Sequence, residues 1–156
     1  MMVDWTFVTA IFSIIGVIGG LISVVFLILG VRRNARAIEG ATVQSLMSFE
    51  KDVFALIAAN ADIYLRGSTG NAKLTAVQKL TFTRIVSVQM SLSYSAYVQF
   101  QQRLIDDEVW EAYESALRAY MKAPGFHESW KSFETHYPQS FRELVNAAEK
   151  TASRGS

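Results

Sequence analysis

The sequence predicts an all-α protein in which one N-terminal transmembrane helix continues into a cytoplasmic antiparallel helical bundle. Residues 5–31 contain no charged residue, and apolar residues recur at helical spacing over most of the remaining chain. No segment alternates apolar and polar residues as a half-buried strand does. The predicted organisation is a membrane anchor over residues 1–31, a helical domain over residues 32–150 and a disordered tail over residues 151–156.

Composition limits the classes of function open to the chain. Of its 156 residues, 51% are hydrophobic and 19% are charged, which is enough apolar material for one packed core. The net charge is +1 and the basic residues are scattered, so we expect no binding to nucleic acid. The chain has no cysteine, so it can form no disulfide, no cysteine-based zinc site and no thiol-dependent active site.

Residues 5–31 have the length of a membrane span. As a helix they extend about 40 Å, against a hydrocarbon thickness of about 30 Å, so a tilted span fits. A cleaved signal peptide is the alternative, but it requires a basic leader and a shorter apolar run, and residues 1–4 contain no Lys or Arg. The residues predicted to flank the span are Trp5 on one side and Arg32, Arg33 and Arg36 on the other. This bias places the N-terminus outside and the C-terminus in the cytoplasm.

Small residues follow one line along the predicted span, which we call the seam. They recur at alternating steps of four and three, and only one member is large: Thr9, Ser13, Gly16, Gly20, Ser23, Leu27 and Gly30. Spans associate through close backbone approach and hydroxyl contacts, and a 3.5-residue period indicates left-handed supercoiling. A chance scatter of Gly and Ser is one alternative. Another is a pore of parallel spans lined by the hydroxyl groups of the seam, although the span lacks the ionisable residues of an ion pathway.

The cytoplasmic helices are predicted from their boundaries. The first should continue the span as far as Arg66, because the turn cluster at residues 67–71 ends it. Thr75 and Gln78 form a capping box that begins the next helix. Acidic residues 106–108 open a third helix, either Pro124 or Phe126 begins a short fourth, and Pro138 begins a fifth.

Residues 85–102 carry no charge and therefore resemble a second span. Four serines and four glutamines in this segment would each lose hydration in a bilayer, so we expect a helix buried among other helices. We expect its aromatic face to pack in the core, with a partner-binding face as the alternative. This face consists of Met90, Tyr94, Tyr97 and Phe100.

No catalytic, cofactor or metal site is predicted. Glu108, Glu111 and Glu114 share a helix face, but neither His127 nor His136 has the Glu three residues earlier that a di-iron bundle uses. The two histidines also lack the spacing of a zinc helix. We therefore expect a protein that is not an enzyme and has no cofactor, with both histidines at the surface or at helix ends.

Three stretches of the chain resemble a loose group of uncharacterised bacterial proteins that have one N-terminal span and a helical cytoplasmic domain. They are residues 31–35 after the span, Pro124-Gly125-Phe126 with Trp130, and Tyr137-Pro138 with Phe141-Arg142. The resemblance implies a location in the bacterial inner membrane. It carries no known activity and no functional residues that can be transferred to this sequence.

Together these features predict a homo-oligomeric inner-membrane scaffold or assembly protein without catalytic activity. Its expected partners are membrane lipid and either further copies of the chain or another membrane subunit. An accessory subunit of a larger membrane complex and a pore formed by parallel spans are the alternatives.

Overall fold

The computed structural model describes the backbone of residues 5–70 and 73–154, and the side chains of residues 23–149 except 25, 32, 71 and 72. The described residues form helices and connecting turns, with no strand among them. The all-helical prediction is therefore confirmed. The chain separates into two compact units, Met1–Gly40 and Ala41–Ser156.

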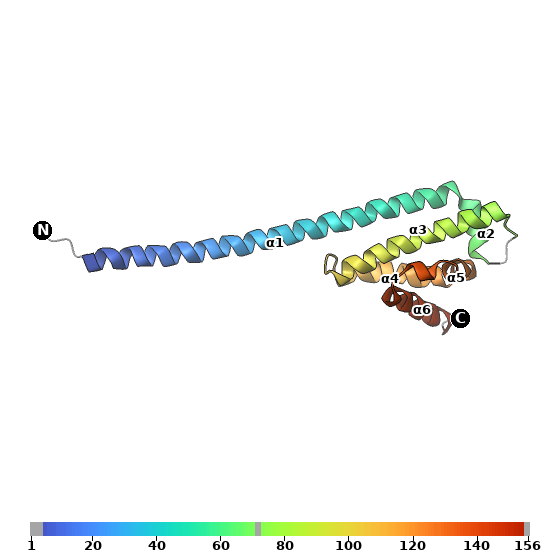
Figure 1. The fold of residues 1–156 in the computed structure, drawn as a ribbon. Coiled ribbons are helices and arrows are strands. Elements are labelled where there is room, and N and C mark those ends of the chain that lie inside the picture. The colour runs from blue at the N-terminus through green and yellow to red at the C-terminus, as the bar shows by residue number, and fades with distance from the viewer. Residues whose placement is uncertain (1–4, 71–72, 155–156) are drawn as a thin grey trace. The chain divides into compact units, whose positions relative to one another are not determined.

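The first helix, α1, runs from Trp5 to Ala59 and α2 from Ala61 to Ser68 (Figure 1). The predicted uninterrupted helix to Arg66 is therefore wrong at Asn60. This residue leaves helical geometry at φ −129° and ψ 30°, and its side-chain amide donates a 2.9 Å hydrogen bond to the carbonyl of Leu56. Asparagine favours such a break because its short side chain competes with the backbone for hydrogen bonds.

Helix α3 runs from Ala76 to Gln101 and has the predicted capping box. The Thr75 hydroxyl accepts from the amide of Gln78 at 3.3 Å, and the Gln78 side chain accepts from the amide of Thr75 at 3.0 Å. At the other end the chain reverses through Arg103, whose φ is +57°. The amide of Arg103 donates to the carbonyl of Phe100 and that of Leu104 to the carbonyl of Gln99, both at 2.9 Å. This is a Schellman motif with arginine at the position that usually holds glycine.

The remaining helices begin close to the residues that the sequence indicated. Helix α4 spans Asp107–Met121, and Asp106 caps it by accepting from the amide of Val109 at 2.8 Å. Helix α5 spans Pro124–Lys131 with its proline in the first turn. A 3₁₀ turn over Glu134–His136 separates it from α6, Gln139–Arg154. The sequence did not indicate the 3₁₀ turn, and α6 includes four residues of the predicted tail.

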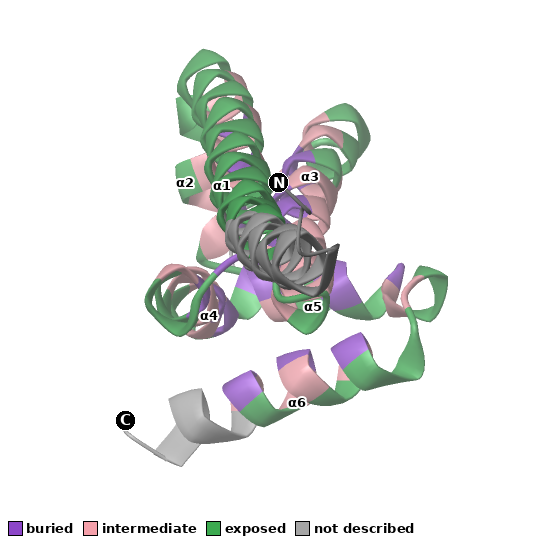
Figure 2. Cartoon of the chain, turned by 90° about the vertical axis from the view of Figure 1, so that its left-hand side faces the viewer, coloured by how far each residue is buried: buried purple, intermediate pink, exposed green. Residues whose placement is uncertain are grey.

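Two hydrophobic clusters hold the second unit together, and α3 contributes to both. Helix α3 packs against α2, α4 and α5, and α4 packs against α6. The buried sides of these helices face one another (Figure 2). The larger cluster consists of Phe82, Val86, Met90, Leu117, Met121, Phe126, Trp130, Phe133, Phe141 and Val145. The smaller cluster joins α1 to α3 and α4 through Leu46, Val53, Leu92, Ala96, Ile105 and Trp110.

The uncharged segment at residues 85–102 lies largely within these clusters, as predicted. Met90 is fully buried, and the rings of Tyr94 and Tyr97 lie 5.1 and 5.6 Å from the ring of Phe141. The Phe100 ring stacks on Trp110 at 5.2 Å. The aromatic face is therefore used for core packing. The glutamines differ from one another, because Gln89 is buried whereas Gln101 and Gln102 are exposed where α3 ends.

Candidate functional surfaces

The end of the predicted span is apolar on every side. Phe26, Leu27, Ile28 and Leu29 are 70, 67, 47 and 44% exposed. Consecutive residues of an α-helix point about 100° apart, so these four side chains cover the whole circumference of α1. A surface of this kind differs from an amphipathic helix, whose apolar residues gather on one side.

None of the helices, over the part of the chain that the structure describes in side-chain detail, is long and apolar enough to cross a membrane. The side chains of residues 5–22, which make up most of the predicted span, lie outside that part. The same holds for the flanking residues Trp5 and Arg32, whereas Arg33 and Arg36 are exposed.

The seam is described only in its second half. Ser23, Leu27 and Gly30 are exposed, and a Cβ atom added to Gly30 would have nothing within 4 Å. The side chains of Thr9 and Ser13, and the glycine positions 16 and 20, lie outside the described part. Exposure does not distinguish the seam, because Phe26 and Ile28 are exposed as well. What distinguishes these positions is the small size of most of their side chains.

A groove that the sequence did not indicate lies between α1 and α4 in the second unit. It encloses about 230 Å³, and its lining residues are Val43, Met47, Glu50, Val109, Ala112, Tyr113 and Ala116. Glu50 is half-buried in this groove. Burial raises the pKa of the Tyr113 phenol, and the negative charge of Glu50 raises it further.

A second phenol lies beside the buried amide of α3. Gln89 is 2% exposed and its Nε2 lies 3.5 Å from the hydroxyl of Tyr64. Burial raises the pKa of Tyr120, with a further contribution from Tyr64, and a hydrogen bond to Gln89 opposes this rise. In the described part of the chain, Oε1 of Gln89 has no hydrogen-bond partner. These groups connect α2, α3 and α4 through polar contacts inside an otherwise apolar core.

The residues considered for catalysis or metal binding lie apart. Glu108 and Glu111 are exposed, and Glu114 pairs with Arg118 at 2.7 Å. Nδ1 of His127 lies 3.0 Å from a carboxylate oxygen of Glu149, and His136 is exposed at the end of the 3₁₀ turn. Residues 23–149, as far as their side chains are described, contain no cluster of three or more potential metal ligands.

No family model, curated protein or solved structure matches the chain. The resemblance to bacterial single-span proteins therefore stays a prediction, and any function must be argued from the surfaces described above.

Proposed function

We propose that the chain is a single-span protein of the bacterial inner membrane, with residues 5–31 in the bilayer and the helical domain in the cytoplasm. In this proposal it acts as a non-enzymatic scaffold or assembly protein that associates with further copies of itself. Membrane lipid surrounds the span, and the second unit provides the surface available to other proteins.

The observation that carries the proposal is the exposed apolar circumference at residues 26–29. Water would contact all four of these large side chains, and burying each one stabilises a protein by about 1.5–3 kcal/mol. A binding groove in another protein covers one face of a helix, whereas lipid covers all faces. Lipid is therefore the environment that best fits this surface, and the uncharged residues before it are numerous enough to complete a span.

The charges beside this segment support one orientation. Asp4 is the only charged residue before the span, while Arg32, Arg33 and Arg36 follow within about one and a half helical turns. Arginine and lysine next to a span are retained on the cytoplasmic side. A reporter enzyme that is active only in the periplasm should therefore be inactive when fused to the C-terminus.

Self-association is proposed from the seam. Two α-helical spans attract each other in lipid through close packing and hydrogen bonds, because the hydrophobic effect does not act between them. The seam offers glycines at positions 16, 20 and 30, where two backbones can approach closely. If the same seam contacts a different helix, the chain is instead an accessory subunit, and if the hydroxyl groups of several copies enclose water it is a pore.

The experiment compares glycines on and off the seam in the full-length chain, in mild detergent and in bilayers. Gly16→Leu and Gly20→Leu add bulk where backbones meet, so crosslinked oligomers should decrease visibly. Gly19→Leu adds the same side chain beside the seam, so its effect should be distinctly smaller. Ser13→Ala should change little, since a hydroxyl contact between spans contributes about 0.6 kcal/mol on average.

The outcomes separate the hypotheses. A defined crosslinked ladder from the purified chain alone supports self-association, whereas its absence together with co-purification of one other membrane protein supports the accessory subunit. Ionic conductance after reconstitution supports the pore. Equal oligomerisation of the two seam variants and the unaltered chain would remove the seam as the contact between copies.

A further inference from the structure

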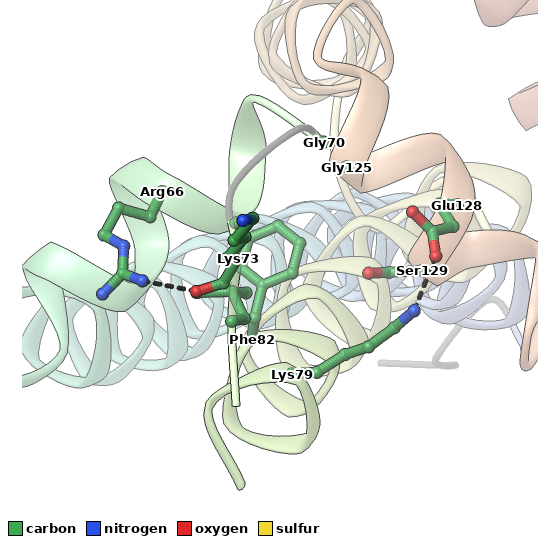
Figure 3. Close-up of a pocket in the computed structure, with 10 residues that line it drawn as sticks. Arg66, Gly70, Lys73, Lys79, Phe82, Gly125, Glu128 and Ser129 are labelled. Atoms are coloured by element: carbon green, nitrogen blue, oxygen red, sulfur yellow. Dashed lines mark hydrogen bonds and ion pairs between the residues drawn. The ribbon is translucent and has the colours of Figure 1, made fainter. Parts of the chain in front are cut away.

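A cavity of about 300 Å³ opens where α2, α3 and α5 meet in the second unit (Figure 3). Phe82 and Leu74 give it an apolar wall, and three cationic side chains and one carboxylate lie around it. The charged lining residues are Arg66, Lys73, Lys79 and Glu128. The sequence pattern did not predict this cluster, because Arg66, Lys79 and Glu128 come from three different helices and Lys73 from the connection between α2 and α3.

Backbone forms part of the cavity lining because two glycines meet there. A Cβ atom on Gly125 would collide with the carbonyl of Gly67, and one on Gly67 would collide with the ring of Phe82. Gly125 lies in the first turn of α5, where a helix leaves amide groups without an intrahelical acceptor. Any other residue at these two positions would keep the helices apart and alter the cavity.

The cationic side chains differ in how firmly they are held. The Arg66 guanidinium contacts Asp62 at 3.1 Å and donates to the carbonyl of Lys73 at 2.7 Å. Lys79 pairs with Glu128 at 2.7 Å, but both side chains are more than half exposed. Lys73 is exposed and has no ion pair within the described part of the chain. Lys73 is therefore not neutralised by a carboxylate. The ion pair of Lys79 is weak because both of its side chains are exposed to solvent.

Ser129 adds a hydroxyl group to this cavity. The residue is only 7% exposed, yet its Oγ atom makes no hydrogen bond within the described residues. It lies one helical turn after Gly125 on the same side of α5, and both residues line the cavity. The Oγ atom itself is not fully buried, so water or a ligand in the cavity can reach it.

We propose that this cavity binds a phosphate group, either free in solution or carried by a lipid headgroup. Lys73 and Lys79 would supply charge, Arg66 would contribute its guanidinium from the α2 side, and the hydroxyl of Ser129 would donate a hydrogen bond. A phosphate presents oxygens in tetrahedral directions and can contact several separate donors, whereas a carboxylate offers two oxygens in one plane. Without a ligand, Glu128 forms an ion pair with Lys79, and the anion displaces Glu128 when it binds.

The inference concerns the second unit and does not depend on membrane insertion or on the seam. It is tested with inorganic pyrophosphate as the probe, titrated calorimetrically into the full-length chain in an uncharged detergent. The unaltered protein should show saturable binding. Lys73→Gln and Lys79→Gln should each weaken it about twofold to fivefold, as expected for a partly exposed charge contact.

Glu128→Gln is the decisive variant because it should strengthen binding, again about twofold to fivefold, by freeing Lys79 and removing repulsion. A purely structural role for the ion pair would not produce such a gain. Ser129→Ala should weaken binding without changing the dependence on salt. Lys122→Gln is the matched control, since it removes an exposed lysine that does not line the cavity.

Lipid and soluble sources are separated by repeating the titration in bilayer discs of phosphatidylcholine with and without phosphatidic acid. A headgroup that fills the cavity lowers the apparent affinity for pyrophosphate in the discs with phosphatidic acid, and this decrease disappears in Lys73→Gln. A soluble ligand leaves the two affinities equal. Absence of saturable pyrophosphate binding, or equal affinities for Glu128→Gln, Lys73→Gln and Lys122→Gln, would overturn the proposal.

Discussion

Two phenylalanines, one in each unit of this protein, have opposite environments. Phe26 in the first unit is 70% exposed, whereas Phe126 in the second is 1% exposed among the rings of Tyr64, Phe82 and Tyr120. In the second unit, the buried apolar residues lie on the inner sides of the helices and meet those of neighbouring helices, while Met47, Phe54, Leu65, Val77 and Leu80 are exposed. In the first unit, apolar residues surround α1 at residues 26–29. The comparison teaches that the second unit contains its own apolar environment, whereas the first needs one supplied from outside.

The largest effect should come from removing the central side chain of the larger cluster. Trp130 is fully buried and its ring lies within 6.1 Å of the rings of Phe133, Tyr137 and Phe141. Trp130→Ala should lower the free energy of unfolding by about 3–5 kcal/mol, measured by urea unfolding of the full chain in mild detergent. Phe26→Ala is the control and should leave unfolding of the second unit unchanged. Similar losses from both variants would contradict the separation between the units.

Replacing one glycine in each unit tests the difference in packing between the two units. Gly125→Ala forces a methyl group against the carbonyl of Gly67, so we expect a loss of about 1–3 kcal/mol from overpacking. Gly40 lies within α1 with nothing near its added Cβ, and Gly40→Ala should stabilise that helix by about 0.5–1 kcal/mol. Thermal unfolding followed by circular dichroism measures both. A stabilised Gly125→Ala protein would show that the contact between α2 and α5 is looser than described.

Replacing Arg103 should have a smaller effect than replacing Gly125, and of the opposite sign. Its positive φ costs an L-residue about 1–2 kcal/mol, and glycine avoids this cost. Glycine itself loses more conformational entropy on folding, which costs about 0.5–1 kcal/mol. Arg103→Gly should therefore raise the free energy of unfolding by about 0.5–1 kcal/mol. Arg103→Ala retains the backbone strain and should not show the gain in the same urea titration.

The smallest effect concerns alkaline pH. Burial raises the pKa values of Tyr113 and Tyr120 above the ordinary value of 10.0, so the folded state holds these two protons more tightly than the unfolded state. This stabilisation is complete below pH 10 and is lost as the pH rises through the folded-state pKa values. Stability should therefore fall more steeply above pH 10 in the unaltered chain than in Tyr113→Phe or Tyr120→Phe. Parallel pH profiles would contradict the assignment.

Local signals in the sequence predicted most helix boundaries. Thr75 with Gln78 and Asp106 act through groups three residues away, and Pro124 acts through its own fixed backbone geometry, so their roles can be recognised without the fold. The break at Asn60 was missed because asparagine is also common on helix surfaces and no proline or glycine marks the position. The burial of Leu46 in the smaller cluster was also not predicted, because it depends on the packing of α1 against α3 and α4.

The cavity and the groove were not predictable for a different reason. The contact of Gly67 with Gly125, and the pairing of Lys79 with Glu128, join residues that are far apart in the chain. Each residue alone has the type expected of a turn or a solvated helix surface. Their chemistry arises only when α2, α3 and α5 pack together, and helical periodicity does not specify which helices do so.

The central claim is that residues 5–31 cross a membrane with the second unit in the cytoplasm, and the absence of cysteine allows a direct measurement. Single variants Asp4→Cys, Phe26→Cys and Ala41→Cys would be treated with a membrane-impermeant maleimide, first on intact spheroplasts and then after lysis. We predict labelling of Asp4→Cys in intact spheroplasts, of Ala41→Cys only after lysis, and of Phe26→Cys only after solubilisation in denaturing detergent. Labelling of Ala41→Cys before lysis would contradict the orientation, and labelling of Phe26→Cys in lysed cells without detergent would contradict the span itself.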